Sequence, residues 1–171
     1  SLIEYMNDEG KIVLLDDIDM TGVTNWTPIG NGKFHGSVTA DDDNHTSHYS
    51  GPAFKGYFDG RGKGILNLKM SAEITASNNV YGLFGILDGA TVENLTVGAA
   101  EGDASELTFS AADSLDVGVV AGAMMSSTIR NCVNYVPMNV KGSTAANRVT
   151  MAGFAGFVYA NQGAGCTLEN L

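Results

Sequence analysis

The chain repeats one short pattern four times, as Ile65-Leu66-Asn67-Leu68, Val92-Glu93-Asn94-Leu95, Ile129-Arg130-Asn131-Cys132 and Leu168-Glu169-Asn170-Leu171. Each copy has an aliphatic residue, a variable residue, Asn and then Leu or Cys, and successive Asn residues are 27, 37 and 39 positions apart. A unit of about 20 to 50 residues is too short to bury its own apolar face, so its core forms only when neighbouring units stack. The pattern therefore predicts a solenoid.

The composition favours strands over helices. The 171 residues include 22 Gly and only three Pro, and 44% of them are hydrophobic. Segments 72–76, 107–111 and 137–141 alternate apolar and polar residues, as half-buried strands do. Together with the Asn motif they predict an all-β, parallel β-helix of four to five coils, with roughly three strands in each coil. Segment 1–7 is the exception, because its apolar residues could form a short amphipathic helix.

Stacked coils align equivalent residues in columns, and each column must be chemically compatible with itself. The recurrent Asn is expected to form a ladder at a corner, where each side-chain amide bonds to the next and to turn backbone. The residue before the Asn points outward and alternates in sign, which predicts weakly stabilising cross-strand pairs. The predicted structural ladder comprises Asn67, Asn94, Asn131 and Asn170.

We interpret residues 1–171 as a single β-helix domain. Residues 1–30 form its N-terminal capping region, in which Trp26 is expected to cover the open end of the core. Residues 31–53 are polar and lack periodicity, which indicates an insertion loop. Residues 54–171 form the repeat coils, and the chain is expected to be a fragment of a longer protein.

The charge excludes several partners. Nineteen acidic and nine basic residues give a net charge of -10, and the Lys and Arg residues are scattered singly. A nucleic acid or an anionic membrane surface would be repelled. No apolar run is long enough to cross a bilayer. Cys132 and Cys166 lack the spacing of a metal site and are expected to be small buried hydrophobic residues, with a bridge between coils as the alternative.

The insertion carries the candidate binding chemistry. Sugars stack on exposed aromatic rings, and imidazoles can hold a transition metal. The ligand-binding candidates are Phe34, His45, His48, Tyr49 and Tyr57. The carboxylates of Asp41, Asp42 and Asp43 could hold calcium, but they lack the spacing of a calcium loop, so a solvated loop is the favoured interpretation. No other cofactor is expected.

Catalysis has little support in the sequence. Asp16, Asp17 and Asp19 could supply the paired carboxylates that glycoside hydrolysis needs, but their alternation with Ile18 and Met20 is better explained by outward-facing strand positions. Polysaccharide lyases also use parallel β-helices with a basic residue beside acidic residues. We find no acidic cluster beside the candidate bases, which are Lys63, Lys69 and Arg130. We therefore predict no catalytic residues.

The unit Gly82-Leu83-Phe84-Gly85 recurs as Gly153-Phe154-Ala155-Gly156 and, in degenerate form, as Val119-Val120-Ala121-Gly122. With the flanking stretches 17–30 and 54–68, this pattern resembles the GLUG-motif repeat family of bacterial, Bacteroidetes-type cell-surface proteins. The resemblance implies a right-handed parallel β-helix that is exported to the cell surface as one module of an adhesin-like protein. It implies no catalytic residues.

The resulting hypothesis is a non-enzymatic, extracellular adhesion or glycan-contact module. Its expected partners are a glycan or a host surface protein, together with other domains of the same chain. A purely structural β-helical spacer is the first alternative. A polysaccharide lyase or hydrolase-like β-helix is the second.

Overall fold

The structure is a computed structural model that describes residues 3–5, 11–35, 48–144, 146, 148–160 and 164–171. Across these ranges the chain forms strands joined by turns, and they contain no helix. The all-β prediction is therefore confirmed. The predicted N-terminal helix is wrong, because Ile3–Tyr5 forms strand β1, which pairs antiparallel with β2 (Lys11–Leu14).

Most strands belong to four sheets whose neighbours run parallel, apart from the antiparallel pair of β1 and β2. The largest sheet contains β1, β2, β3 (Ile18–Asp19), β6 (Tyr57–Leu66), β10 (Thr91–Val97), β14 (Thr128–Asn134) and β18 (Thr167–Glu169). The second contains β7 (Lys69–Ile74), β11 (Glu106–Ala111) and β15 (Met138–Gly142). The third contains β8 (Asn79–Tyr81), β12 (Leu115–Gly118) and β16 (Val149–Ala152). The fourth contains β9 (Phe84–Asp88), β13 (Ala121–Met125) and β17 (Ala155–Tyr159).

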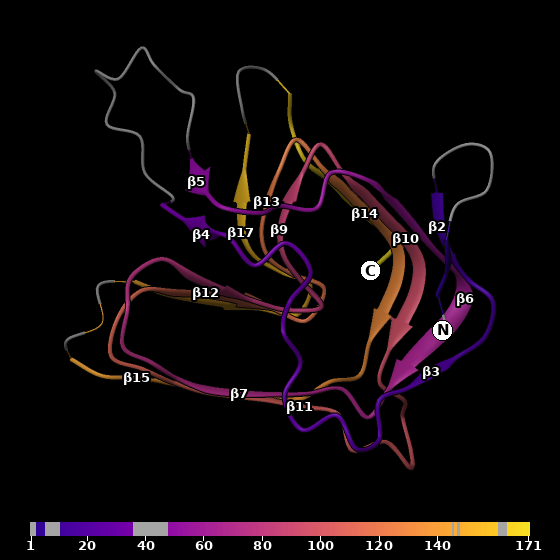
Figure 1. The fold of residues 1–171 in the computed structure, drawn as a ribbon, viewed down its shortest axis with the longest axis horizontal. Helices are drawn as coiled ribbons and strands as arrows, with labels where there is room; N and C mark the ends of the chain where they lie inside the picture. Colours follow the sequence, from indigo (N-terminus) through magenta and orange to yellow (C-terminus); the bar gives the residue numbers. More distant parts are fainter. Residues whose placement is uncertain (1–2, 6–10, 36–47, 145, 147, 161–163) are drawn as a thin grey trace.

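Each repeat supplies one strand to each of these four sheets. The chain passes through β10, β11, β12 and β13 before β14 returns it to the first sheet beside β10. Figure 1 shows the strands of each sheet lying over one another as stacked layers. The prediction of three strands per repeat is wrong, because each complete repeat has a further short strand, β8, β12 or β16, before the Gly-containing corner.

The register of the first sheet differs from the one that the sequence motif suggests. Val92 lies beside Ile129, and Ile129 lies beside Leu168, as expected. On its other side, however, Val92 lies beside Phe58, whereas Ile65 lies beside Val97. The register shifts between Glu93 and Leu95, where β6 carries extra residues. The motif around Asn67 therefore belongs to a different corner from the other three copies.

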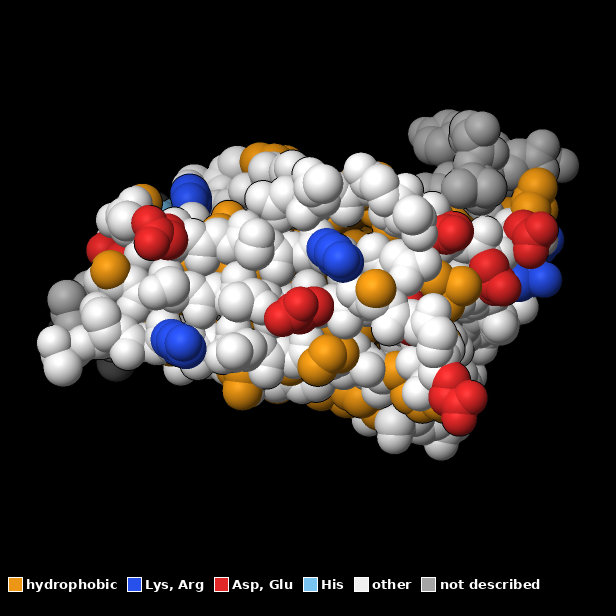
Figure 2. All heavy atoms as spheres, turned by 90° about the horizontal axis from the view of Figure 1, so that it is seen from below, with side chains coloured by type: hydrophobic (Ala, Val, Ile, Leu, Met, Phe, Trp, Pro, Cys, Tyr) orange, Lys and Arg blue, Asp and Glu red, His pale blue; other side chains and the backbone are white. Residues whose placement is uncertain are grey.

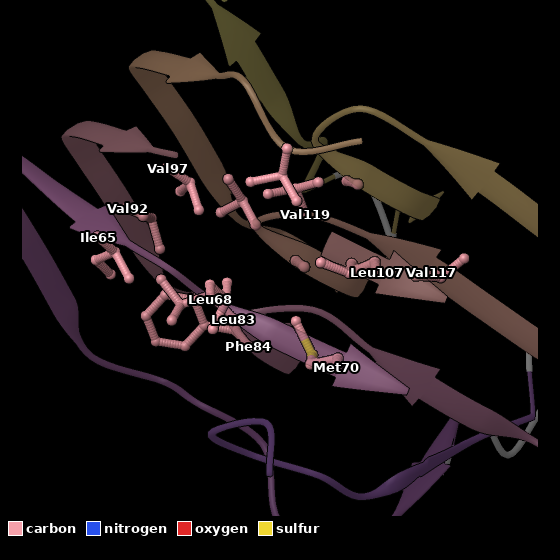
Figure 3. Packing of buried hydrophobic residues seen from close by; sticks show 14 of the residues in the cluster. Ile65, Leu68, Met70, Leu83, Phe84, Val92, Val97, Leu107, Val117 and Val119 are labelled. Carbon is pink, nitrogen blue, oxygen red and sulfur yellow. The ribbon is translucent and has the colours of Figure 1, made fainter. Parts of the chain in front are cut away.

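The main core lies inside an L-shaped outline that the four sheets form in Figure 1. One arm lies between the β7–β11–β15 and β8–β12–β16 sheets, and the other lies between the first and fourth sheets. Figure 3 shows Met70 and Leu107 in the first arm and Val92 and Phe84 in the second, all within one continuous apolar cluster. This burial of apolar side chains across layers is the main force that holds the repeats together.

Glycine occupies the second position of β9, β13 and β17, as Gly85, Gly122 and Gly156. A Cβ atom at these positions would lie 2.6 to 2.7 Å from backbone atoms of another strand or turn. Such distances are well inside van der Waals contact, so only glycine fits without a backbone shift. Close backbone approach at this corner explains why the Gly-x-x-Gly unit recurs.

A second apolar cluster fills the concave side of the L. The hairpin of β4 (Lys33–Phe34) and β5 (Tyr49–Ser50) lies beside the outer face of the fourth sheet in Figure 1. Phe34 is fully buried there, and its ring centroid is 5.2 Å from that of Phe157. The described ends of the predicted insertion 31–53 are thus part of the packed structure. Residues 36–47 lie outside the described ranges.

A buried ion pair borders this second cluster. Asp116 of β12 is fully buried and accepts hydrogen bonds from Nε and Nη2 of Arg148, at 3.1 and 2.6 Å, and from the Thr150 hydroxyl at 2.6 Å. The Arg148 guanidinium also lies 5.0 Å from the centre of the Phe157 ring. These contacts compensate the buried carboxylate, as its isolation from water requires.

The segment between β3 and β4 crosses the N-terminal side of the stack. Its backbone bonds to successive strands, from Met20 N to Leu66 O, from Trp26 N to Lys69 O and from Ile29 N to Leu83 O. The Trp26 ring is partly buried and packs against the main core. This packing is consistent with the predicted position of the Trp26 ring over an end of the core.

The last layer leaves part of the core exposed. Met151, Val158 and Leu168 are 53%, 45% and 45% exposed, although they continue columns whose inner members are buried. The two cysteines are not bonded to each other. Cys132 is buried in the core, as predicted, whereas Cys166 is partly exposed.

Candidate ligand-binding pocket

A pocket of about 150 Å³ lies between the segment 25–33 and strand β8. Small-molecule sites usually have volumes of about 300 to 1,000 Å³, so this pocket suits one small unit of a ligand and not a whole cofactor. Its lining combines two aromatic rings with amides, a hydroxyl and an ammonium group. The lining residues are Asn25, Trp26, Thr27, Pro28, Asn31, Gly32, Lys33, Asn79, Val80 and Tyr81.

The aromatic part of the pocket is held rigidly. The indole Nε1 of Trp26 donates a hydrogen bond of 3.0 Å to the carbonyl of Leu83, and the rest of the ring packs on the core. The ring of Tyr81 lies 4.7 Å from that of Phe109. Both rings are partly exposed. A ring that is fixed before binding loses little conformational freedom when a ligand stacks on it.

The polar part of the pocket is also organised. Asn25 exchanges hydrogen bonds with the backbone of Ser71, from Nδ2 to the carbonyl at 3.2 Å and from the amide to Oδ1 at 3.1 Å. Lys33 Nζ donates to Oδ1 of Asn79, and Asn79 Nδ2 donates to the carbonyl of Ala76. The side chain of Asn31 is exposed to solvent. These groups can donate to and accept from hydroxyl groups.

The structure does not support the predicted cluster of exposed aromatic rings. Phe34 is fully buried because it packs against the apolar outer face of the fourth sheet, so a sugar cannot stack on it. Tyr49 is partly buried, and its hydroxyl donates a 2.7 Å bond to Oδ2 of Asp88. Tyr57 lies on another sheet, where Lys11 Nζ is 4.4 Å from its ring centre and its hydroxyl donates to Glu93.

The other insertion candidates do not form a described site. His48 is 4% exposed, and its ring lies 4.3 Å from that of Tyr159. Neither of its ring nitrogens has a hydrogen-bond partner within the described part of the chain. The remaining candidates, Asp41, Asp42, Asp43 and His45, lie outside the described residues. Elsewhere in those described residues, no group of three or more His, Cys, Asp or Glu side chains is placed to hold a metal ion.

The acidic residues near the N-terminus act as hydrogen-bond acceptors within the fold. Asp17 Oδ1 accepts from the amide of Gly64 at 2.7 Å. Asp19 Oδ1 accepts from the Thr21 hydroxyl at 2.7 Å and from Asn67 Nδ2 at 2.8 Å. These bonds, with the Thr21 hydroxyl bond as the largest contribution, lower the pKa of Asp19. A general acid for glycoside hydrolysis needs a raised pKa, so Asp19 is poorly suited to that role.

A second concave surface lies on the outer face of the β7–β11–β15 sheet. Its lining residues are Ser71, Ala72, Glu73, Thr108, Phe109, Ser110, Asn139 and Lys141. Figure 2, which views the molecule from this side, shows single acidic and basic side chains separated by backbone, uncharged side chains and exposed hydrophobic groups. The charges of Glu73 and Lys141 flank Ser110 in the strand register. The only aromatic residue in this lining is the buried Phe109, so the surface lacks an exposed aromatic ring of the kind that the Trp26 pocket offers.

The sequence did not indicate that Trp26, Lys33, Asn79 and Tyr81 meet. The only indication in the sequence is a single Trp in a turn that contains Asn and Pro. This pattern is equally compatible with a ring that covers the end of the core. Lys33 and Asn79 are far apart in the chain and are joined only because β4 crosses beside β8. Long-range crossings of this kind leave no local pattern.

No family model, curated protein or solved structure matches this chain. The geometry of the pocket therefore carries the functional argument. Among the described residues there is no helix that is long and apolar enough to span a bilayer.

Proposed function

We propose that the chain is a non-enzymatic, extracellular module that contacts glycans at the Trp26 pocket. The observation that carries this proposal is a fixed, partly exposed indole beside amide, hydroxyl and ammonium groups. A sugar has an apolar C–H face that stacks on an aromatic ring, and its hydroxyl groups need both donors and acceptors. The pocket offers both kinds of contact in one place.

The proposed scaffold is a right-handed parallel β-helix of four to five coils, with four strands in each complete coil. Stacked parallel sheets support this scaffold. The likeness of Gly82-Leu83-Phe84-Gly85 to a repeat unit of bacterial cell-surface proteins supports display on a bacterial surface. A rigid stack of this kind can present a pocket away from the cell, where a glycan or host surface protein can reach it.

The test is binding of the chain to an array of neutral and acidic glycans from host, plant and bacterial sources. The variant Thr27→Ala/Asn31→Ala changes two exposed side chains of the pocket and should abolish binding while leaving the urea unfolding midpoint unchanged. The matched control Asn139→Ala alters the outer face of β15 and should bind normally.

Two results would overturn this proposal. If no glycan on the array binds, the alternative of a structural spacer is favoured, because the regular stack of sheets is sufficient for that role. Binding that survives Thr27→Ala/Asn31→Ala but is lost in Asn139→Ala would place the contact on the β7–β11–β15 face.

A further inference from the structure

Lys33 is the one charged residue among the described residues that line the Trp26 pocket. The protein as a whole carries a net charge of -10. None of the pocket's described lining residues is acidic. The pocket is therefore a small positively charged site on a strongly acidic molecule.

Among the described residues, no ion pair neutralises the charge of Lys33. Ion pairs within the described ranges join Lys55 to Asp88, Arg130 to Glu93 and Arg148 to Asp116. Lys33 takes part in none of them, and its ammonium group donates instead to the neutral Oδ1 of Asn79. This bond orients the ammonium group beside the pocket without removing its charge. A carboxylate on a ligand would supply the missing opposite charge.

We infer that the pocket selects an acidic sugar, namely a uronic acid unit whose carboxylate bonds to Lys33 while its ring stacks on Trp26 or Tyr81. This inference rests on the proposed glycan-contact function and names the ligand class of the same site. A charge-assisted hydrogen bond is stronger than a neutral one, so the carboxylate determines which sugar binds best. The acidic remainder of the surface repels polyanions that cannot place a carboxylate at this point.

The chain has a built-in reporter for this site. Trp26 is the only tryptophan, so the intrinsic indole fluorescence of the protein comes from the pocket. The probes are methyl β-D-glucuronide and methyl β-D-glucoside, which differ only in a carboxylate against a hydroxymethyl group. Sodium acetate serves as a third probe, because it carries the carboxylate without the sugar ring. All titrations are made at one ionic strength, since exposed charges are screened by salt.

The glucuronide should change the Trp26 fluorescence saturably and bind about tenfold or more tightly than the glucoside, as the loss of one charge-assisted hydrogen bond predicts. Lys33→Met keeps the apolar stem of the side chain and should remove this preference, whereas Lys33→Arg should retain most of it. Lys141→Met removes an exposed lysine on the other face and should leave the preference intact. Acetate should not reproduce the effect of the glucuronide.

Three outcomes overturn the inference. Equal binding of glucuronide and glucoside that Lys33→Met leaves unchanged would reject acidic-sugar selection while preserving the glycan-contact function. An acetate response as strong as that of the glucuronide would identify a simple anion site. A lack of response to either sugar would also reject the inference, and the glycan array would then decide independently whether the proposed function survives.

Discussion

The side-chain amide of Asn131 donates a hydrogen bond of 3.2 Å to Oδ1 of Asn94, which lies in the neighbouring strand of the same sheet. The same arrangement continues on both sides. Asn170 Nδ2 donates to Asn131 Oδ1 at 2.8 Å, and Asn94 Nδ2 donates to Asp59 Oδ1 at 3.0 Å. The three Asn residues also have positive φ angles, of 55° at Asn94, 53° at Asn131 and 49° at Asn170. Asn satisfies both requirements, because it tolerates this backbone region and bonds to its own kind.

Replacing Asn131 should reveal these two roles separately. Asn131→Leu loses the ladder bonds and is strained at a positive φ, so it should lower the free energy of unfolding by about 1–3 kcal/mol. Asn131→Gly loses only the ladder hydrogen bonds, because glycine adopts this φ freely. It should therefore lower the free energy of unfolding by less than Asn131→Leu does. Urea unfolding measures both values. Glu169→Ala, at the exposed end of the adjacent column, should cost less than about 1 kcal/mol, and a larger loss there than in Asn131→Leu would contradict the assignment of faces.

The glycine column at the start of β9, β13 and β17 makes a second prediction. A Cβ on Gly156 would lie 2.6 Å from the backbone N and O of Val117. Gly156→Ala should therefore destabilise the fold by about 1–3 kcal/mol through forced backbone movement. A Cβ on Gly142 would lie 3.6 Å from Val149 Cγ2, which is an ordinary contact. Gly142→Ala should therefore be neutral or stabilise by up to about 1 kcal/mol. Equal effects in thermal unfolding would refute the close-approach explanation.

The sequence predicted the Asn94–Asn131–Asn170 column correctly but wrongly added Asn67. Asn67 also has a positive φ, of 57°, and precedes a fully buried leucine, so its local motif is the same. Its partners are different, since its amide N donates to Asp103 Oδ1 and its side chain donates to Asp19 and Thr21. The four-residue motif predicts the local backbone conformation. The strand register depends instead on the extra residues in β6, and no repeated sequence pattern indicates them.

The candidate site was less accessible from sequence than the fold. The residues that stack in columns recur in every repeat, so one sequence contains several copies of each structural pattern. The pocket occurs once and joins residues of separate segments through the crossing of 25–33 over β8. The prediction that Phe34 is exposed is wrong for the same reason. The apolar face that buries Phe34 comes from β9, β13 and β17, far along the chain.

The Asp103 contact predicts a loss of stability in acid. Burial raises the pKa of Asp103, but hydrogen bonds from the amide of Asn67 and from Ser105 outweigh it, so the net pKa is lowered. A carboxylate whose pKa is lower in the folded state stabilises the fold above its unfolded pKa of about 3.9 and loses that contribution as the pH falls through the folded value. Asp103→Asn should therefore be less stable at pH 7 and lose less stability than the wild type below about pH 4. Urea midpoints across this range test it, with the exposed Glu101→Gln as the control.

Arg148 and Asp116 should show strong energetic coupling. Arg148→Met leaves a fully buried carboxylate without its cation. This substitution should lower the free energy of unfolding by about 3–5 kcal/mol. The double variant Arg148→Met/Asp116→Leu removes the stranded charge and should recover most of this loss. The pair Lys55–Asp88, in which the lysine is exposed, provides the comparison, since Lys55→Met should cost less than about 1 kcal/mol. Additive losses in the double-mutant cycle would show that the two side chains do not stabilise each other.

His48 should be replaceable with a gain in stability. Its imidazole is 4% exposed and packs at a tilt against the ring of Tyr159, yet no described residue bonds to either ring nitrogen. A buried polar group without a partner costs about 1–3 kcal/mol, and an apolar ring of similar shape avoids that cost. His48→Phe should therefore raise the free energy of unfolding by about 1 kcal/mol. His35→Phe is the matched control, because His35 is exposed and its Nδ1 lies 2.9 Å from Asn78 Nδ2, so that substitution should bring no gain. A lower melting temperature for His48→Phe than for the wild type would mean that the imidazole has a stabilising partner.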